Sequence, residues 1–305
     1  MRVREHEHSL VSLAEITEIE LLMLKRVREV TMGEHRSVFH GSGFEFTGLR
    51  TWEAGDRLSQ VNWPQSTITN FDPLVVSEFE QPATASVIAL ADRSASRRCG
   101  LDGTPIAAAI ARAIATFGMS AVFFQDAFGL LTFDSGFGHL GALRPRVGKG
   151  QVIHSLDCYA TGEGLADIRP GDSLSMTVSS AIRRTSLVPV ISDFLFDAAG
   201  DTLAELALLA NTHDVIVVLV DAAFAFALPP VSAGWVEAFD VETGRSRLMS
   251  RRGFAESADR VRAWQDQVER QARSLGLDVL RLAGDDDRTA AALSEFVVLR
   301  RLRKN

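Results

Sequence analysis

The segment that decides the fold is Ser86-Val-Ile-Ala-Leu-Ala-Asp92-Arg-Ser94-Ala-Ser96. It begins with an apolar run of the length of one buried strand, and polar residues follow where that run ends. Two later runs have the same form, since Leu187–Ile191 is followed by Ser192-Asp193 and Val215–Val220 is followed by Asp221. Continuous apolar strands, unlike alternating ones, are typical of a parallel sheet that is covered on both faces.

Segments with helical spacing of apolar residues separate these strand candidates. We expect helices over residues 104–118, 148–156, 174–184, 200–211, 254–275 and 287–302, further strands at Ala127–Phe133 and Leu277–Leu282, and a hairpin made by Trp235–Val241 and Ser246–Ser250. Strands that alternate with helices predict an α/β fold with a doubly wound, mostly parallel sheet of the Rossmann type.

The first part of the chain differs in character. Residues 9–30 have helical spacing, whereas residues 31–82 are rich in glycine and aromatic residues, a composition that favours short strands and loops. We therefore predict two parts: residues 1–82 form an N-terminal helix and a small β-rich element, and residues 83–305 form the α/β domain. Trp52 and Trp63 are expected to fill the core of the small element.

Composition limits the function classes. The 305 residues include 32 Lys and Arg against 39 Asp and Glu, a net charge of −7, which argues against a globally basic nucleic-acid footprint. Cys99 and Cys158 are expected to be reduced thiols. Asp221 interrupts the most apolar stretch, which is too short for the roughly 20 residues of a spanning helix. The N-terminus carries no apolar signal core, and we expect a cytoplasmic protein without a transmembrane segment.

The residues that follow the strands can carry chemistry. Ligands of doubly wound sheets bind at the carboxyl ends of strands, where Asp92, Ser94 and Ser96 leave one strand and Asp193 leaves another. Carboxylate and hydroxyl oxygens suit Mg²⁺ or another hard divalent cation. Ser173, before the helix at 174–184, is our candidate for a further hydroxyl, with Thr177 as the second choice.

Local sequence leaves another interpretation open. Asp, Ser and Thr at a strand end also cap helices and form turns without any ion. Arg93, Arg97 and Arg98 crowd the same loop, where they can pair with Asp92 and compete with a cation, or face outward to an acidic partner.

Two sets of motifs resemble known families. Asp92-x-Ser94-x-Ser96 with a later Ser192-Asp193 resembles the metal-ion-dependent adhesion site of von Willebrand factor A domains. Gly41–Phe46, Leu49–Asp56 and Val61–Trp63 resemble a series of motifs of the family catalogued as domain of unknown function 58 (DUF58). This second resemblance extends from about Met32 to Arg303. The chain departs from the family patterns at Trp52 for Tyr, Asn62 for Asp, Arg97 for Met and Ser173 for Thr.

The resemblance implies a von Willebrand factor A-like domain that is not an enzyme. It implies a metal site made by Asp92, Ser94, Ser96, Ser173 and Asp193, with one coordination position left for an acidic side chain of another protein. It also implies a MoxR-type AAA+ ATPase partner and a client protein that is assembled or matured.

Two alternatives belong to other classes. The sequence has no phosphate-binding Gly-x4-Gly-Lys-Ser/Thr loop and no Gly-x-Ser-x-Gly elbow. A metal-dependent hydrolase that uses Asp92 and Asp193 would still need a general base, for which no clear candidate exists. A metal-free scaffold would instead use Asp92 as a helix cap or as a partner of Arg97 or Arg98.

Overall fold

The computed structural model describes residues 10–33, 45–53, 61–80, 86–101, 104–134, 140–168, 173–226, 235–239, 246–282, 293 and 295–296. The chain divides into two compact units. The smaller unit is residues 34–84, and the larger unit combines residues 1–33 with residues 85–305.

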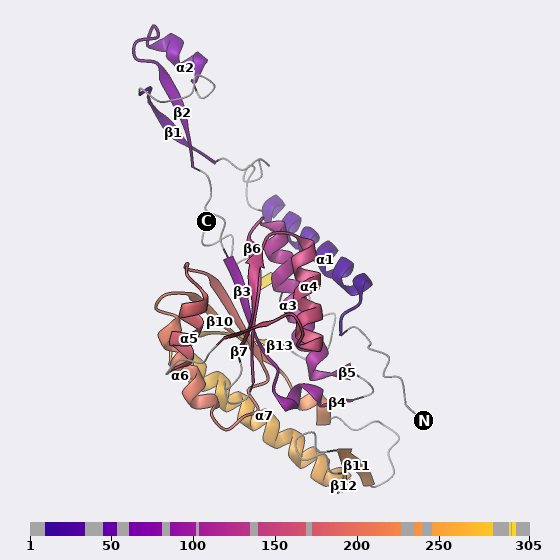
Figure 1. The fold of residues 1–305 in the computed structure, drawn as a ribbon. Helices are drawn as coiled ribbons and strands as arrows, with labels where there is room; N and C mark the ends of the chain where they lie inside the picture. Colours follow the sequence, from indigo (N-terminus) through magenta and orange to yellow (C-terminus); the bar gives the residue numbers. More distant parts are fainter. Residues whose placement is uncertain are drawn as a thin grey trace. The chain divides into compact units, whose positions relative to one another are not determined.

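A seven-stranded sheet forms the centre of the larger unit, in the order β13-β10-β9-β3-β6-β7-β8 (Figure 1). Its strands are β3 (Ser86–Asp92), β6 (Ala127–Phe133), β7 (Leu140–Arg146), β8 (Ala166–Ile168), β9 (Leu187–Ser192), β10 (Asp214–Val220) and β13 (Asp278–Leu282). All neighbours from β13 to β6 pair in parallel, whereas β7 pairs antiparallel with both β6 and β8. The predicted α/β fold with a mostly parallel sheet is confirmed.

The strand order fixes where a site can form. From the central β3 the chain first builds β6, β7 and β8 on one side, and then β9, β10 and β13 on the other. The order therefore reverses between β3 and β9, and this switch point is where doubly wound sheets bind ligands at the carboxyl ends of their strands.

Both faces of the sheet are buried, which explains the continuous apolar strands. Along β3, Val87 and Ala89 join one core cluster while Ile88 and Leu90 join the other. In Figure 1 the helices α1 (Leu13–Gly33), α3 (Ile106–Phe123) and α4 (Lys149–Thr161) lie on one side of the sheet, with α5 (Leu174–Ala181) and α6 (Ala199–Leu209) on the other. The long helix α7 (Arg251–Ser274) adds Val268 and Ala272 to the second cluster.

The N-terminal helix belongs to the larger unit. Ile16, Ile19 and Met23 of α1 are buried in the core cluster that α3 and α4 share. Glu15 pairs with Arg112 of α3 at 3.3 Å, and Glu20 pairs with Lys149 of α4 at 2.5 Å. The larger unit therefore includes α1, whereas the predicted division places residues 1–82 together in one part, because the apolar stripe of α1 packs on the α/β domain.

The helix α3 is long and apolar enough to span a membrane, contrary to the prediction that the most apolar stretch is too short. Among the described helices it alone is long and apolar enough, with a mean hydropathy of 1.7 over Ile106–Phe123. In the structure 78% of that window is buried, as in the central helix of a globular domain. Cys99 and Cys158 do not form a disulfide bond.

The smaller unit is a two-stranded antiparallel sheet, β1 (Glu45–Thr51) and β2 (Val75–Glu80), with the short helix α2 (Trp63–Ile68). The Asn62 side chain caps α2 by accepting the backbone N–H of Gln65 at 3.1 Å. Val61 and Val76 are buried, but the Trp63 side chain is 52% exposed. The expectation that Trp63 fills this core is wrong, since Trp63 opens the helix on its solvent side.

The remaining elements are short or peripheral. The predicted hairpin is present as β11 (Trp235–Phe239) and β12 (Ser246–Ser250), which pair antiparallel. The strands β4 (Gly100–Leu101) and β5 (Thr104–Pro105) form a second small pair. Most of the helix predicted at 287–302 lies outside the described residues.

Two leucines of α6 test the packing. Leu206 is fully buried and Leu208 is 58% exposed on the same helix. We expect Leu206→Ala to lower the free energy of unfolding by about 3 kcal/mol, because it leaves a cavity under the sheet. Leu208→Ala should change it by no more than about 0.5 kcal/mol. Urea denaturation measures both, and equal losses would contradict the described orientation of α6.

Candidate metal centre

Two acidic residues meet at the switch point. Asp92 is the last residue of β3, and Asp193 directly follows Ser192 at the end of β9. The two strands pair in parallel with Ala91 beside Ile191, so their carboxyl ends coincide. Each acidic residue is only 1% exposed.

The Asp92 carboxylate is held by both strand ends. Its Oδ1 accepts the backbone N–H of Ser94 at 2.6 Å, and its Oδ2 accepts the hydroxyl of Ser192 at 2.5 Å. The hydroxyl of Tyr159 donates to the Asp92 backbone carbonyl at 3.0 Å. Burial raises the pKa of Asp92, although the hydrogen bonds from Ser192 and Ser94 oppose that rise.

Asp193 retains an oxygen without a partner. Its Oδ1 accepts the backbone N–H of Leu195 at 3.0 Å, whereas its Oδ2 is buried with no hydrogen bond from the described residues. Burial, reinforced by the negative charge of Asp92, raises the pKa of Asp193 to about 7. A buried acid with a free oxygen, next to a second acid, favours the uptake of either a proton or a cation.

The predicted hydroxyls of Ser94 and Ser96 lie at the same place. Their Oγ atoms are 2.9 Å apart, and the Ser96 hydroxyl lowers the pKa of Asp193, which places it beside that carboxyl. The structure thus brings Asp92, Ser94, Ser96 and Asp193 together, as the sequence predicts.

Ser173 is engaged elsewhere. Its hydroxyl caps α5 by accepting the backbone N–H of Met176 at 3.3 Å, and it lies 3.1 Å from the Ser175 hydroxyl. The second choice, Thr177, donates to the Ser173 carbonyl at 2.7 Å. Within the described ranges no interaction joins Ser173 to Asp92 or Asp193. The hydroxyl that β9 does supply belongs to Ser192, which our predicted ligand set omits although Ser192-Asp193 is visible in the sequence.

Arg97 is the arginine whose charge acts on Asp92, and it contacts Tyr159 instead of pairing with an acid. The Arg97 guanidinium donates to the Tyr159 carbonyl at 3.3 Å and lies 5.6 Å from the centre of the Tyr159 ring. Its positive charge lowers the pKa of Asp92 from a distance. No ion pair joins a basic side chain to either acid in the part of the chain that the structure describes.

The helix α7 fixes the loop that carries Asp193. The buried Gln265 amide donates to the carbonyls of Asp193 at 3.0 Å and Val220 at 2.8 Å. Trp264 Nε1 donates to the Phe194 carbonyl at 2.8 Å. Phe194 is fully buried with a φ of +53°, a left-handed conformation that these contacts hold in place. Gln265 and Trp264 were not foreseen, because only the fold brings α7 to this loop.

The donor set fits a hard cation with incomplete coordination. Two carboxylates and the hydroxyls of Ser94 and Ser96 are oxygen donors of the kind that Mg²⁺ takes. Among the described residues no cluster of three or more His, Cys, Asp or Glu side chains exists that could hold an ion. A cation here would therefore take further ligands from water or from another molecule.

The strand order and the Asp-x-Ser-x-Ser loop at the switch point define a doubly wound α/β domain with a mostly parallel sheet. The family described as "Protein of unknown function DUF58" matches residues 48–273, and the chain belongs to this family. The crystal structure of the conserved hypothetical protein BatB from Bacteroides thetaiotaomicron is similar, with a TM-score of 0.39 and 14% sequence identity over 72% of this chain and 100% of that chain. No curated protein matches the chain.

Asp193 makes a testable contribution to the pH dependence of stability. Because its pKa is raised from 3.8 to about 7, the folded chain binds more protons than the unfolded chain between these values. The contribution of Asp193 to the free energy of unfolding is therefore largest at low pH and decreases as the pH rises towards 7. Above pH 7 this contribution no longer changes with pH. Asp193→Asn, which mimics the protonated acid, should remove this decline and raise the unfolding temperature at pH 8 relative to wild type.

Thermal unfolding in chelator-containing buffer from pH 5 to pH 8 measures this difference. The exposed Asp197 lies in the same loop, so Asp197→Asn removes an equal charge without removing a buried acid. A difference between Asp193→Asn and wild type that does not change with pH would contradict the raised pKa.

Proposed function

We propose that this chain is a non-enzymatic protein-interaction module that recognises its partner through a divalent cation. The observation that carries the proposal is the pair of buried acids on adjacent strand ends, of which Asp193 keeps a buried Oδ2 that accepts no hydrogen bond from the described residues. Asp92, Ser94, Ser96 and Asp193 would hold Mg²⁺, with Ser192 orienting Asp92. Ser173 is left out of this set because its hydroxyl caps α5.

Coordination explains how such a site binds a protein. The two buried carboxylates balance the charge of a dication, but together with the hydroxyls of Ser94 and Ser96 they leave part of its coordination shell unfilled. A Glu or Asp from a partner supplies a further oxygen ligand. The ion then bridges two surfaces, and the recognition needs no nucleophile or general base.

The partners we propose come from the family resemblance. They are a MoxR-type AAA+ ATPase and a client protein that the pair assembles or matures in the cytoplasm. The net charge of −7 makes a nucleic-acid partner a poor match.

Calorimetric titration with Mg²⁺ and Mn²⁺ tests the ion. We expect binding heat and a higher unfolding temperature for wild type, since a ligand at a hundred times its Kd stabilises by about 2.7 kcal/mol. Asp92→Asn should lose both responses, while the exposed control Asp201→Asn keeps them. Without heat or thermal shift at millimolar metal, the metal-free scaffold would be the better account.

A pull-down tests the partner. Because the ATPase itself uses Mg²⁺ with its nucleotide, the informative comparison is wild type against Asp92→Asn at constant Mg²⁺. We expect the cognate ATPase to be retained by wild type and by Asp201→Asn but not by Asp92→Asn. Equal retention by all three would refute cation-mediated docking, and metal-dependent turnover that Asp92→Asn abolishes would favour a hydrolase.

A further inference from the structure

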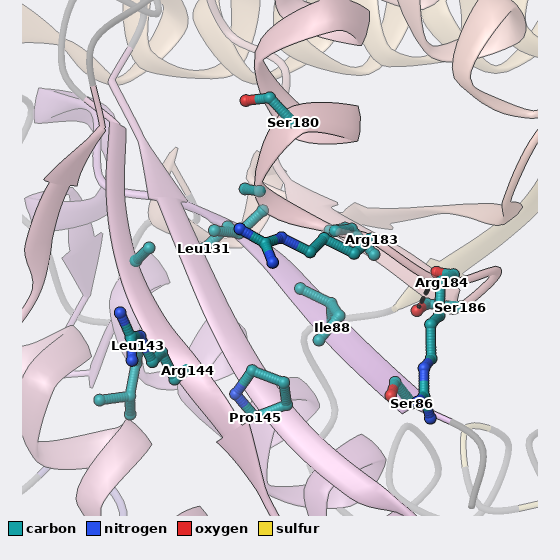
Figure 2. Close-up of a pocket in the computed structure, with 13 residues that line it drawn as sticks. Ser86, Ile88, Leu131, Leu143, Arg144, Pro145, Ser180, Arg183, Arg184 and Ser186 are labelled. Carbon is teal, nitrogen blue, oxygen red and sulfur yellow. Dashed lines mark hydrogen bonds between the residues drawn. The ribbon is translucent and has the colours of Figure 1, made fainter.

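A groove of about 570 Å³ opens on one face of the sheet, towards the edge where β3 and β9 begin (Figure 2). The candidate metal centre lies at the other edge, where these two strands end. Ser86 and Ser186 lie where β3 and β9 begin, and Arg144 and Pro145 lie where the antiparallel β7 ends. Ile88 and Leu131 form its apolar floor and are only 5% and 3% exposed.

The groove exists because α5 is too short to cover the strands beneath it. Its 8 residues span about 12 Å, whereas the 7 residues of β3 or β6 span about 23 Å. The helix ends at Ala181, and the segment from Ile182 to Ser186 returns to β9 along the rim. Part of the sheet face is thus left under an irregular segment instead of a helix.

Arginines line this groove. Arg183 and Arg184 follow α5, and Arg144 comes from β7. In Figure 2, Arg183 lies over Leu131, with Arg144 and Arg184 on either side of it. Among the described residues no carboxylate pairs with any of the three. Asp126, directly before β6, and Asp214, the first residue of β10, also lie at this edge, but neither lines the groove.

The position of the arginines is not explained by helix capping alone. Cations after the end of a helix interact favourably with its dipole, which accounts for Arg183 and Arg184. Arg144 belongs to a strand and gains nothing from that dipole. Three arginines, one from β7 and two from the segment after α5, therefore line one groove with an apolar floor, and none of them pairs with a carboxylate among the described residues, in a chain whose net charge is −7.

We propose that this groove binds an acidic peptide segment of a partner protein, with an apolar side chain seated between its carboxylates. Guanidinium groups bind carboxylates in a planar, two-pronged geometry, and the floor of Ile88 and Leu131 accepts an apolar anchor. A bilayer is a poor occupant because that floor is recessed and buried. No lining residue is aromatic, so the stacking that single-stranded nucleic acid uses is missing there.

The groove and the metal centre are independent. Ser86 on the rim of the groove and Asp92 of the metal centre lie at opposite ends of β3, roughly 20 Å apart along the strand. One copy of the chain can therefore hold an acidic segment at one edge while its other edge contacts a second protein. This inference does not rest on the proposed function, since it needs no cation.

Fluorescence anisotropy with a dye-labelled peptide of alternating Glu and Leu tests the proposal. We expect saturable binding that weakens with added salt, and at least a tenfold loss for Arg144→Gln/Arg183→Gln. The matched control Arg260→Gln/Arg270→Gln removes two exposed charges from α7 and should bind as wild type does. Ser180→Trp, which fills the groove but keeps every arginine, should also lose binding, and circular dichroism checks that each variant is folded.

Two further peptides separate the contributions. Replacing Glu by Gln should abolish binding, and replacing Leu by Ser should weaken it severalfold. Asp92→Asn should bind the Glu-Leu peptide as wild type does, which keeps this result apart from that of the metal centre. Equal binding by the Arg144→Gln/Arg183→Gln variant and its control, or binding of anionic lipid vesicles but not of the peptide, would overturn the proposal.

Discussion

The hydrogen bond from the Ser192 hydroxyl to Asp92 Oδ2, 2.5 Å long, is the constraint on which the site depends. It joins the ends of two strands that are adjacent in the sheet but separated by a hundred residues of chain. The bond is possible because the strand order reverses between β3 and β9, so that the two carboxyl ends coincide. The same hydroxyl accepts the Phe194 N–H at 2.8 Å, and it thereby orients Asp92 and shapes the loop of Asp193 at once.

Keeping two acids buried so close together carries a cost, which the surrounding structure offsets. Desolvation and mutual repulsion raise the pKa of Asp193 to about 7, and a carboxylate in this environment would escape to water if its loop were free. Gln265 and Trp264 prevent this by holding the carbonyls of Asp193 and Phe194 from α7. Burying Asp193 lowers the stability of the fold, so selection for stability alone would not favour it. A buried acid with a raised pKa, held rigidly in place, is instead typical of a binding site.

The sequence predicts the parallel core well and the edges poorly. Continuous apolar runs predict the bounds of β3, β9 and β10 to within a residue or two, because burial on both faces of the sheet makes nearly every position of these strands apolar. The strands β7 and β8 were not predicted: Gly141 and Pro145 interrupt the pattern of β7, as glycine and proline do near sheet edges. The switch point in the strand order predicts that Asp92, Ser94, Ser96 and Asp193 lie together. The sequence does not predict that Ser192, and not Ser173, supplies the next hydroxyl. Both serines lie near the end of a strand or helix, and only the packing of the loops distinguishes them.

The polarity of a parallel sheet explains why the two edges differ in chemistry. Every strand from β13 to β6 points the same way, so all turns that follow strands meet at one edge and all turns that precede strands meet at the other. At the first edge the turns bring together acids and hydroxyls, which suit a cation. At the second, Arg183 and Arg184 follow the end of a helix that is too short to cover the sheet, and the antiparallel β7 returns Arg144 to the same edge. If β7 ran parallel to its neighbours, Arg144 would lie at the same edge as Asp92 and Asp193. The antiparallel direction of β7 therefore separates this arginine from the two acids.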